Sequence, residues 1–215
     1  MKRSFLILLL ISLSLPSFAQ DSKIRRQSFD SYRELDSTSY LLIPIEWDNS
    51  PRVGEIKVAG AGRKQNIFFY DPETEENRFL FDGRMQIIEG YKGHLLNSRY
   101  KGDTSKRPLN KEHIYYSVIN QDYNEDKKLD SNDPSYLYMS RFDGTGLIRL
   151  TPESYDLQTY RYIERSNIIL ATLTYDENQD GKFNNNDTAV LYKIDLNDLS
   201  KSKEVTKLRL KVNPK

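Results

Sequence analysis

The sequence contains no cysteine, and it has only two histidines and one tryptophan among 215 residues. Without cysteine, the chain can form neither a disulfide nor a thiolate nucleophile. His94 and His113 stand nineteen residues apart and do not form a zinc-ligand pattern. The G-x-S-x-G nucleophile elbow and the H-E-x-x-H zinc motif are also missing. These absences disfavour the enzyme classes that depend on such groups and leave carboxylates as the candidates for chemistry.

An excess of charge of one sign is also missing, and long apolar runs are scarce. Lys and Arg number 32 against 31 Asp and Glu, a formal charge of +1 that gives no general attraction to nucleic acid. One apolar run, Phe5–Leu15, follows a basic start and precedes the small-x-small site at Ser17–Ala19. This pattern predicts a secretory signal peptide over residues 1–19, too short to span a membrane. No later segment is apolar enough to cross one, so we expect a secreted or periplasmic protein.

Aromatic residues are plentiful, with fifteen tyrosines and nine phenylalanines, and this composition favours strands over helices. After a polar lead-in at residues 20–39, we expect one all-β domain over residues 40–215. The first predicted strands are Tyr40–Trp47, Val53–Val58, Ile67–Tyr70, Arg78–Phe81 and Met85–Ile88, with a turn at Ala59–Gly62, an acidic hairpin tip at Asp71–Asn77 and a solvated loop at Lys92–Glu112. Pro44 should place the first strand at a sheet edge or split it.

The second half of the chain contains an internal repeat. Residues 113–143 align without gaps on residues 167–197, and each unit reads as a strand, a polar loop and a strand. Strands are also predicted at Leu147–Leu150, Thr159–Ile163 and Glu204–Leu210. One antiparallel four-stranded sheet should therefore contain Tyr160–Ile163, Ile168–Leu173, Ala189–Ile194 and Val205–Leu210, which is the size of a propeller blade. The predicted fold is a partial or small propeller of blade-like sheets; a β-sandwich is the alternative.

Two twelve-residue segments have the oxygen-rich spacing of a calcium loop. The first loop, Asp122–Asp133, reads D-Y-N-E-D-K-K-L-D-S-N-D, and the second loop, Asp176–Asp187, reads D-E-N-Q-D-G-K-F-N-N-N-D. Such spacing suits Ca²⁺, which takes about 6–8 oxygen ligands. The expected ligand positions are Asp122, Asn124, Asp126, Lys128, Asp130 and Asp133 in the first loop and Asp176, Asn178, Asp180, Lys182, Asn184 and Asp187 in the second, with position seven acting through its main-chain carbonyl.

The two loops should differ in affinity. Position six is Gly181 in the second loop but Lys127 in the first, where a left-handed backbone costs roughly 1 kcal/mol or more. Position twelve is Asp in both, and its shorter arm reaches an ion less readily than Glu. We therefore expect tighter binding at the second loop, in the range of extracellular modules, about 10⁻⁴–10⁻³ M. The alternative is that Asp and Asn merely favour turns; two matches in one register of a repeat favour calcium.

The residues that flank the loops indicate a structural ion and not a sensor. They are short, β-branched and aromatic, so each loop should close a β-hairpin, whereas a sensor needs flanking helices that open on binding. Most tyrosines should lie in the core, although some aromatic residues could form a binding face.

The segment Tyr136–Pro152 resembles the repeat of the Tol-system periplasmic propeller family, in which a strand ends in Asp-Gly and the next ends in Leu-Thr. The matching residues are Asp143, Gly144, Leu150 and Thr151. The two loops resemble those of EF-hand and dockerin-type modules. These resemblances imply a calcium-binding protein of the bacterial envelope that has a scaffolding role or binds a protein or glycan. The alternative function is a secreted hydrolase that acts on glycans with carboxylates brought together in one pocket.

Overall fold

The computed structural model describes residues 27–30, 32–35, 38–47, 64–82, 86–93, 113–184 and 186–208. The predicted signal peptide, the predicted strand at Val53–Val58 with its following turn, and nearly all of the predicted loop at 92–112 lie outside the described residues. Within the described part, the protein is all-β, as predicted, with antiparallel sheets of nine and four strands and two short 3₁₀ helices.

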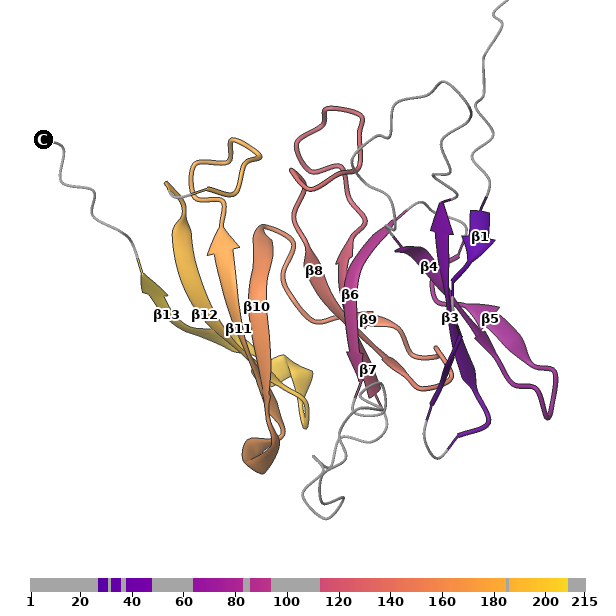
Figure 1. Ribbon diagram of the computed structural model, residues 1–215. Helices are drawn as coiled ribbons and strands as arrows, with labels where there is room; N and C mark the ends of the chain where they lie inside the picture. Colours follow the sequence, from indigo (N-terminus) through magenta and orange to yellow (C-terminus); the bar gives the residue numbers. More distant parts are fainter. Residues whose placement is uncertain are drawn as a thin grey trace, which may run out of the picture.

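The larger sheet consists of two parts that, among the described residues, are joined by a single residue pair. Its strands are β1 (Gln27–Phe29), β2 (Arg33–Glu34), β3 (Leu41–Trp47), β4 (Lys64–Tyr70), β5 (Asn77–Phe79), β6 (Ile87–Gly93), β7 (His113–Ile119), β8 (Tyr136–Arg141) and β9 (Ile148–Arg149). The order is β1-β3-β4-β6-β7-β8-β9, with β2 beside β3 and β5 beside β4. In the part of the chain that the structure describes, β4 pairs with β6 through Lys64 and Ile88 alone. Figure 1 accordingly shows β3, β4 and β5 fanning away from β6–β9.

The smaller sheet is the four-stranded sheet that the repeat predicted. It contains β10 (Tyr155–Ile163), β11 (Ile168–Tyr175), β12 (Thr188–Asp195) and β13 (Lys203–Leu208) in that order. The equivalent strands of the two repeat units are β7 with β11 and β8 with β12. The predicted acidic hairpin is confirmed as well, because β4 pairs with β5 around the turn at 71–76. Two strands, β1 and β2, come from the segment expected to be a polar lead-in.

The prediction that Pro44 makes its strand an edge strand, or splits it, is wrong. Strand β3 runs unbroken through Pro44 and pairs with β4 on one side, where Pro44 stands opposite Ile67. On the other side, β3 pairs with β1 from Ile45 onward and with β2 up to Leu42. The missing N–H of Pro44 therefore falls in the gap between two short partner strands, where no ladder bond is needed from it.

The strands β7 and β8 are covered on both faces. One core cluster contains Leu42, Ile67 and Phe69 from β3 and β4 together with Ile114, Tyr116 and Val118 from β7. A second cluster contains Tyr115 and Leu137 from the same pair of strands with Ile169, Ala171 and Leu173 from β11. Successive residues of β7 thus point into different cores, as the period-two alternation of a strand requires. The β6–β9 part of the larger sheet therefore lies between the β1–β5 part of that sheet and the smaller sheet.

The Asp143-Gly144 turn contacts the neighbouring part of the sheet. Gly144 has a φ of +81°, and a Cβ built on it would lie 2.5 Å from Cδ2 of Phe69 on β4. The Asp143 carboxylate accepts hydrogen bonds from the Thr145 amide at 2.9 Å and the Thr145 hydroxyl at 2.6 Å. Glycine is therefore required here both by the backbone conformation and by the close approach of an aromatic ring.

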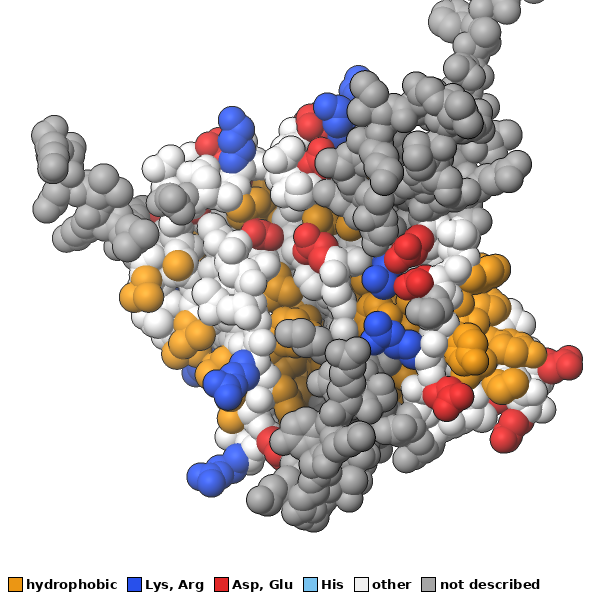
Figure 2. All heavy atoms as spheres, viewed as in Figure 1, with side chains coloured by type: hydrophobic (Ala, Val, Ile, Leu, Met, Phe, Trp, Pro, Cys, Tyr) orange, Lys and Arg blue, Asp and Glu red, His pale blue; other side chains and the backbone are white. Residues whose placement is uncertain are grey.

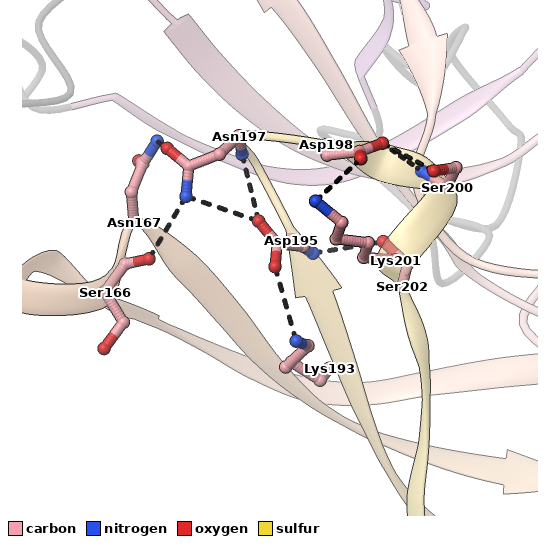
Figure 3. A network of polar contacts seen from close by, with 9 residues as sticks. All are labelled: Ser166, Asn167, Lys193, Asp195, Asn197, Asp198, Ser200, Lys201 and Ser202. Atoms are coloured by element: carbon pink, nitrogen blue, oxygen red, sulfur yellow. Dashed lines mark hydrogen bonds and ion pairs between the residues drawn. The ribbon is translucent and has the colours of Figure 1, made fainter.

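A polar network connects the two turns at the end of the smaller sheet that lies opposite the β11–β12 loop (Figure 3). Asn197 donates to the Asp195 carboxylate at 3.3 Å and to the Ser166 carbonyl at 3.4 Å, and it accepts from Asn167 at 2.8 Å. These contacts join the turn at η3 (Glu164–Ser166) to the turn at η4 (Leu199–Lys201). Lys193 pairs with Asp195 at 3.3 Å.

Exposed aromatic rings line the β1–β5 side of the molecule. The ring of Phe68 on β4 lies 6.1 Å from that of Phe29 and 5.1 Å from that of Phe79, measured between centroids. Phe29 and Phe79 are 68% and 50% exposed. Figure 2 shows the apolar side chains gathered on this side. Three rings in contact shield one another in part, which limits the apolar surface that water reaches.

Candidate functional site

The two predicted calcium loops close equivalent hairpins of the fold. The first loop joins β7 to β8, and the second joins β11 to β12. Both project from the same end of the molecule (Figure 1). The loops touch each other, since the rings of Tyr123 in the first loop and Phe183 in the second have centroids 5.4 Å apart. The repeat predicted that each loop lies on a hairpin, and the structure adds that the loops are neighbours.

The same set of side-chain to main-chain hydrogen bonds shapes both loops. In each, the position-five amide donates to the side chains of positions one and three, and the position-six amide donates to the other carboxylate oxygen of position one. The amides of positions seven, nine and eleven donate to the side chains of positions five, twelve and nine. All these distances lie between 2.8 and 3.2 Å. The residues predicted as ligands therefore organise the loop backbone.

Positions four and six are left-handed in both loops. The φ angles are 58° at Glu125 and 58° at Gln179 for position four, and 66° at Lys127 and 73° at Gly181 for position six. A left-handed conformation costs an L-residue roughly 1–2 kcal/mol, and glycine avoids that cost. The first loop thus adopts at Lys127 the strained conformation that the sequence led us to expect there.

Three loop carboxylates are buried, and none of them has a cationic partner among the described residues. Asp133 is 4% exposed, Asp176 is 1% exposed and Asp187 is 8% exposed. None of the ion pairs among the described residues includes any of them. Burial of an ionised carboxylate is costly unless hydrogen bonds or an opposite charge compensate it. The loop amides provide part of that compensation, and a bound cation would provide more.

The remaining predicted ligands lie at or near the loop surface. Asn178, Asp180, Lys182 and Asn184 are exposed in the second loop, as are Asp126 and Lys128 in the first, whereas Asp122, Asn124 and Asp130 are half-buried. Within the described ranges, no group of three or more His, Cys, Asp or Glu side chains is arranged to hold a metal ion. A complete shell would therefore need the asparagine side chains and main-chain carbonyls. This all-oxygen donor set fits a hard cation such as Ca²⁺ and does not fit zinc.

One functional candidate that the sequence did not identify is Tyr123, at position two of the first loop. Its half-buried ring packs on that of Phe183 in the second loop, and its main-chain amide donates to Oδ1 of Asp133 at 3.0 Å. Burial raises the pKa of Tyr123, the Asp176 carboxylate raises it further, and the Ser154 hydroxyl opposes the shift. The main-chain amide of Asp176 also donates to the Ser154 carbonyl at 3.4 Å. The only signal in the sequence was an aromatic residue where the second loop has Glu177.

A second polar cluster links β6, β7, β8 and β10. The hydroxyls of Ser117 and Ser135 are 2.7 Å apart, and Ser117 donates to the Glu89 carboxylate at 3.3 Å. The Ser135 amide donates to Asp156 at 2.8 Å. Burial, with a further contribution from the charge of Glu89, raises the pKa of Asp156 to about 6. This chain of hydrogen bonds connects the two sheets, and the sequence analysis did not identify it.

The fold and the site define the chain as an all-β protein whose repeated hairpins end in loops rich in aspartate and asparagine. Comparisons with protein-family models, curated proteins and solved structures found no match. In the part of the chain that the structure describes, no helix has both the length and the apolar character that a membrane span requires.

Proposed function

We propose that this chain is an exported calcium-binding β-repeat protein of the bacterial envelope, in which two ions stabilise neighbouring hairpins. The ions bind at the first and second loops and have a structural role. The protein serves as a scaffold or a binding module for an envelope protein or a glycan. Export rests on the predicted signal peptide at residues 1–19, and the lack of cysteine makes bound ions a suitable substitute for disulfides.

The observation that carries this proposal is the shape of the first loop at Lys127. At this position glycine or asparagine would adopt the left-handed conformation at lower conformational energy than lysine. Here the carboxylate of Asp122 accepts the Lys127 amide at 2.9 Å and holds it in that conformation. The same shape thus recurs in two loops of different sequence, and in both it directs oxygen-bearing side chains toward the loop amides. A calcium-binding role shared by both loops would account for this recurring backbone shape.

Calcium binding would add stability by mass action. An ion that binds only the folded protein stabilises it by about 2.7 kcal/mol when its free concentration is 100 times the dissociation constant. For a chain of this size, that free energy corresponds to a rise in melting temperature of about 5–10 °C for each site. Weak sites suffice for this role where the calcium concentration is high.

Titration calorimetry of the purified protein tests the proposal. We expect a calcium heat that magnesium does not reproduce, together with a higher melting temperature in calcium than in chelator. Asp176→Ala should abolish the tighter site. Asp82→Ala removes an exposed carboxylate outside both loops and should leave both sites intact. If calcium gives no heat and chelator does not change the melting temperature, the loops are metal-free turns held by their own amides.

The partner is addressed by a pull-down from the native envelope with and without chelator. Capture that depends on calcium supports a role in which the ions shape the binding surface. Capture that is unchanged by chelator assigns the ions to folding stability alone.

A further inference from the structure

The β1–β5 part of the larger sheet has an apolar face that points away from the rest of the molecule. Phe69 of β4 lies in a core cluster, so its neighbour Phe68 points to the opposite side of the strand. The register brings Ile43, Phe68 and Phe79 into one row across β3, β4 and β5, and the ring of Phe29 packs on that of Phe68. We call this surface the aromatic face; its members are Phe29, Leu41, Ile43, Phe68 and Phe79.

The smaller sheet has an outward face on the other side of the molecule. Residues 169, 171 and 173 of β11 lie in the second core cluster, so the residues between them point outward. The register adds outward residues from β12 and β13, and the apolar ones include Leu170, Leu191 and Leu208. Leu208 is 66% exposed, and the other two are half-buried. Figure 2 shows apolar side chains on both outer sides, over β5 and over β13.

A row of basic residues crosses the outward face of the smaller sheet. Arg161 pairs with Leu170, Leu170 with Lys193, and Lys193 with Lys203. Lys193 forms an ion pair with Asp195, but none of the ion pairs among the described residues includes Arg161 or Lys203. The turns at η3 and η4 each add one charge of either sign. The face is therefore positive. We call it the basic face; its members are Arg161, Leu170, Leu191, Lys193, Lys203 and Leu208.

Acidic residues border the aromatic face at the corresponding end. Glu34 is exposed and pairs with Leu41, at the edge of this face. The turn between β4 and β5 adds three exposed carboxylates, those of Glu73, Glu75 and Glu76. This acidic border and the basic row both lie toward the end of the molecule opposite the two loops (Figure 1). The two apolar faces thus have opposite charges at the same end.

We propose that this chain forms a two-fold symmetric dimer in which the aromatic face of each copy packs on the basic face of the other. A two-fold axis along the strand direction keeps the end opposite the loops at the same level in both copies. The acidic border of one copy then meets the basic row of the other. Both contacts form at once, because each copy supplies one face of each kind. They repeat between copies the face-to-face sheet packing that the three layers show within one copy.

The charges and the faces together favour a second copy as the occupant. A group of large exposed apolar side chains on one face marks an interaction site more often than a free surface. Opposite charges at the border determine the choice and orientation of the partner. A different partner with an acidic apolar surface would cover the basic face and leave the aromatic face exposed, whereas a second copy covers both. The inference does not depend on calcium, because neither face contains a residue of the two loops.

Sedimentation equilibrium of the purified protein measures the association. We expect the mass of two chains and a dissociation constant that rises with salt, because salt screens the border charges. Phe79→Ser removes an exposed ring from the short strand β5 and should raise the dissociation constant about tenfold or more. Ile148→Ser is the matched control. Ile148 is 40% exposed on β9, outside both faces, and its replacement should leave the dimer unchanged.

Reversing the charges tests whether the two faces meet. One variant combines Arg161→Glu with Lys203→Glu, and the other combines Glu34→Lys with Glu75→Lys. Each variant alone places like charges in both contacts, so its dissociation constant should rise about tenfold or more. A mixture of the two variants should associate again, because a dimer with one copy of each has opposite charges in both contacts. Arg141→Glu, at an exposed position of β8 outside both faces, should leave the dimer unchanged.

Three results would overturn the inference. The first is an unaltered protein that sediments as a single chain at every concentration, or as an assembly larger than a dimer. The second is a dimer that neither charge-reversed variant weakens. The third is a mixture of these two variants that associates no better than each alone, since the acidic border and the basic row would then not face each other. The charge reversals alter only exposed side chains, so they remain informative if Phe79→Ser fails to fold.

Discussion

Lys127 and Gly181 occupy position six of their loops and have φ angles of 66° and 73°. Replacing Lys127 by glycine should remove a left-handed conformational cost of about 1–2 kcal/mol from the folded state. The greater backbone entropy of glycine in the unfolded chain offsets about 0.5–1 kcal/mol of that gain. We therefore expect Lys127→Gly to raise the free energy of unfolding by roughly 0.5–1 kcal/mol, measured by urea titration in chelator.

Lys127→Ala serves as the control, because alanine removes the charge and the long side chain but keeps the left-handed cost. A gain in stability with alanine equal to that with glycine would mean that charge, and not backbone strain, governs this position.

Gly144 and Gly146 form a similar pair at the turn between β8 and β9. Both have positive φ angles, +81° and +65°, but only Gly144 lies against a ring, that of Phe69. Gly146→Ala should lower the free energy of unfolding by about 1–2 kcal/mol, because of backbone strain alone. Gly144→Ala should lower the free energy of unfolding by about 1–3 kcal/mol more than Gly146→Ala, because the added methyl group overpacks the core. Chemical denaturation of the two variants measures this difference, and equal losses would contradict the role of the Phe69 contact.

Strands β6, β7, β8 and β10 are connected by the hydrogen-bond chain that ends at Asp156. Its pKa of about 6 in the folded protein exceeds the value of about 3.9 expected in the unfolded chain. Between these values the folded protein binds more protons, so the contribution of Asp156 to stability falls as the pH rises from about 4 to about 6. The groups that face it are Glu89, Ser135 and Gln158.

Asp156→Asn should remove this pH dependence, because asparagine keeps an oxygen to accept the Ser135 amide and does not ionise. The measurement is the free energy of unfolding of both proteins between pH 4 and pH 7. The curves should differ in slope below pH 6 and run parallel above it. Parallel curves over the whole range would show that Asp156 titrates as an ordinary carboxyl.

The polar network at the other end of the smaller sheet should show the opposite dependence on pH. Burial alone would raise the pKa of Asp195, but hydrogen bonds from Lys193 and Asn197 outweigh it and lower the pKa below its usual value. Asp195 thus contributes stability above the unfolded pKa and loses it as the pH falls through the folded pKa. Asp195→Asn should accordingly lower stability at pH 7 and leave it nearly unchanged at pH 2, as thermal unfolding would show.

The secondary-structure elements were more predictable from the sequence than the contacts between them. Apolar and aromatic runs located β11 and β12, and the repeat located the equivalent β7 and β8, because these signals are local. The position of Pro44 could not be predicted, since it depends on where β1 and β2 leave β3 unpaired. The ring contact between Tyr123 and Phe183 was also missed, because it joins residues sixty positions apart through the packing of two hairpins.

At the scale of the whole molecule, the central strands β7 and β8 contribute side chains to both core clusters. Ile114 points into one cluster and Leu137 into the other, and both are completely buried. We expect Ile114→Ala and Leu137→Ala each to cost about 2–5 kcal/mol. Because the two cores share these strands, either change should destabilise the whole protein. Hydrogen exchange should show β4 and β12 losing protection at the same denaturant concentration in both variants. Loss confined to one side would show that the two cores unfold independently.

If the two loops bind calcium as proposed, their placement at one end of the molecule would make the charge of that end depend on the free calcium concentration. With no ion bound, the two loops form a concentrated negative pole, while the formal charge of the full sequence is only +1. Each Ca²⁺ that binds cancels two of these charges. The protein would then approach an anionic polymer or membrane with this end more easily where calcium is abundant, and would be turned away from it where calcium is depleted. The orientation of the molecule on a charged surface, and not only its stability, would follow the concentration of free calcium.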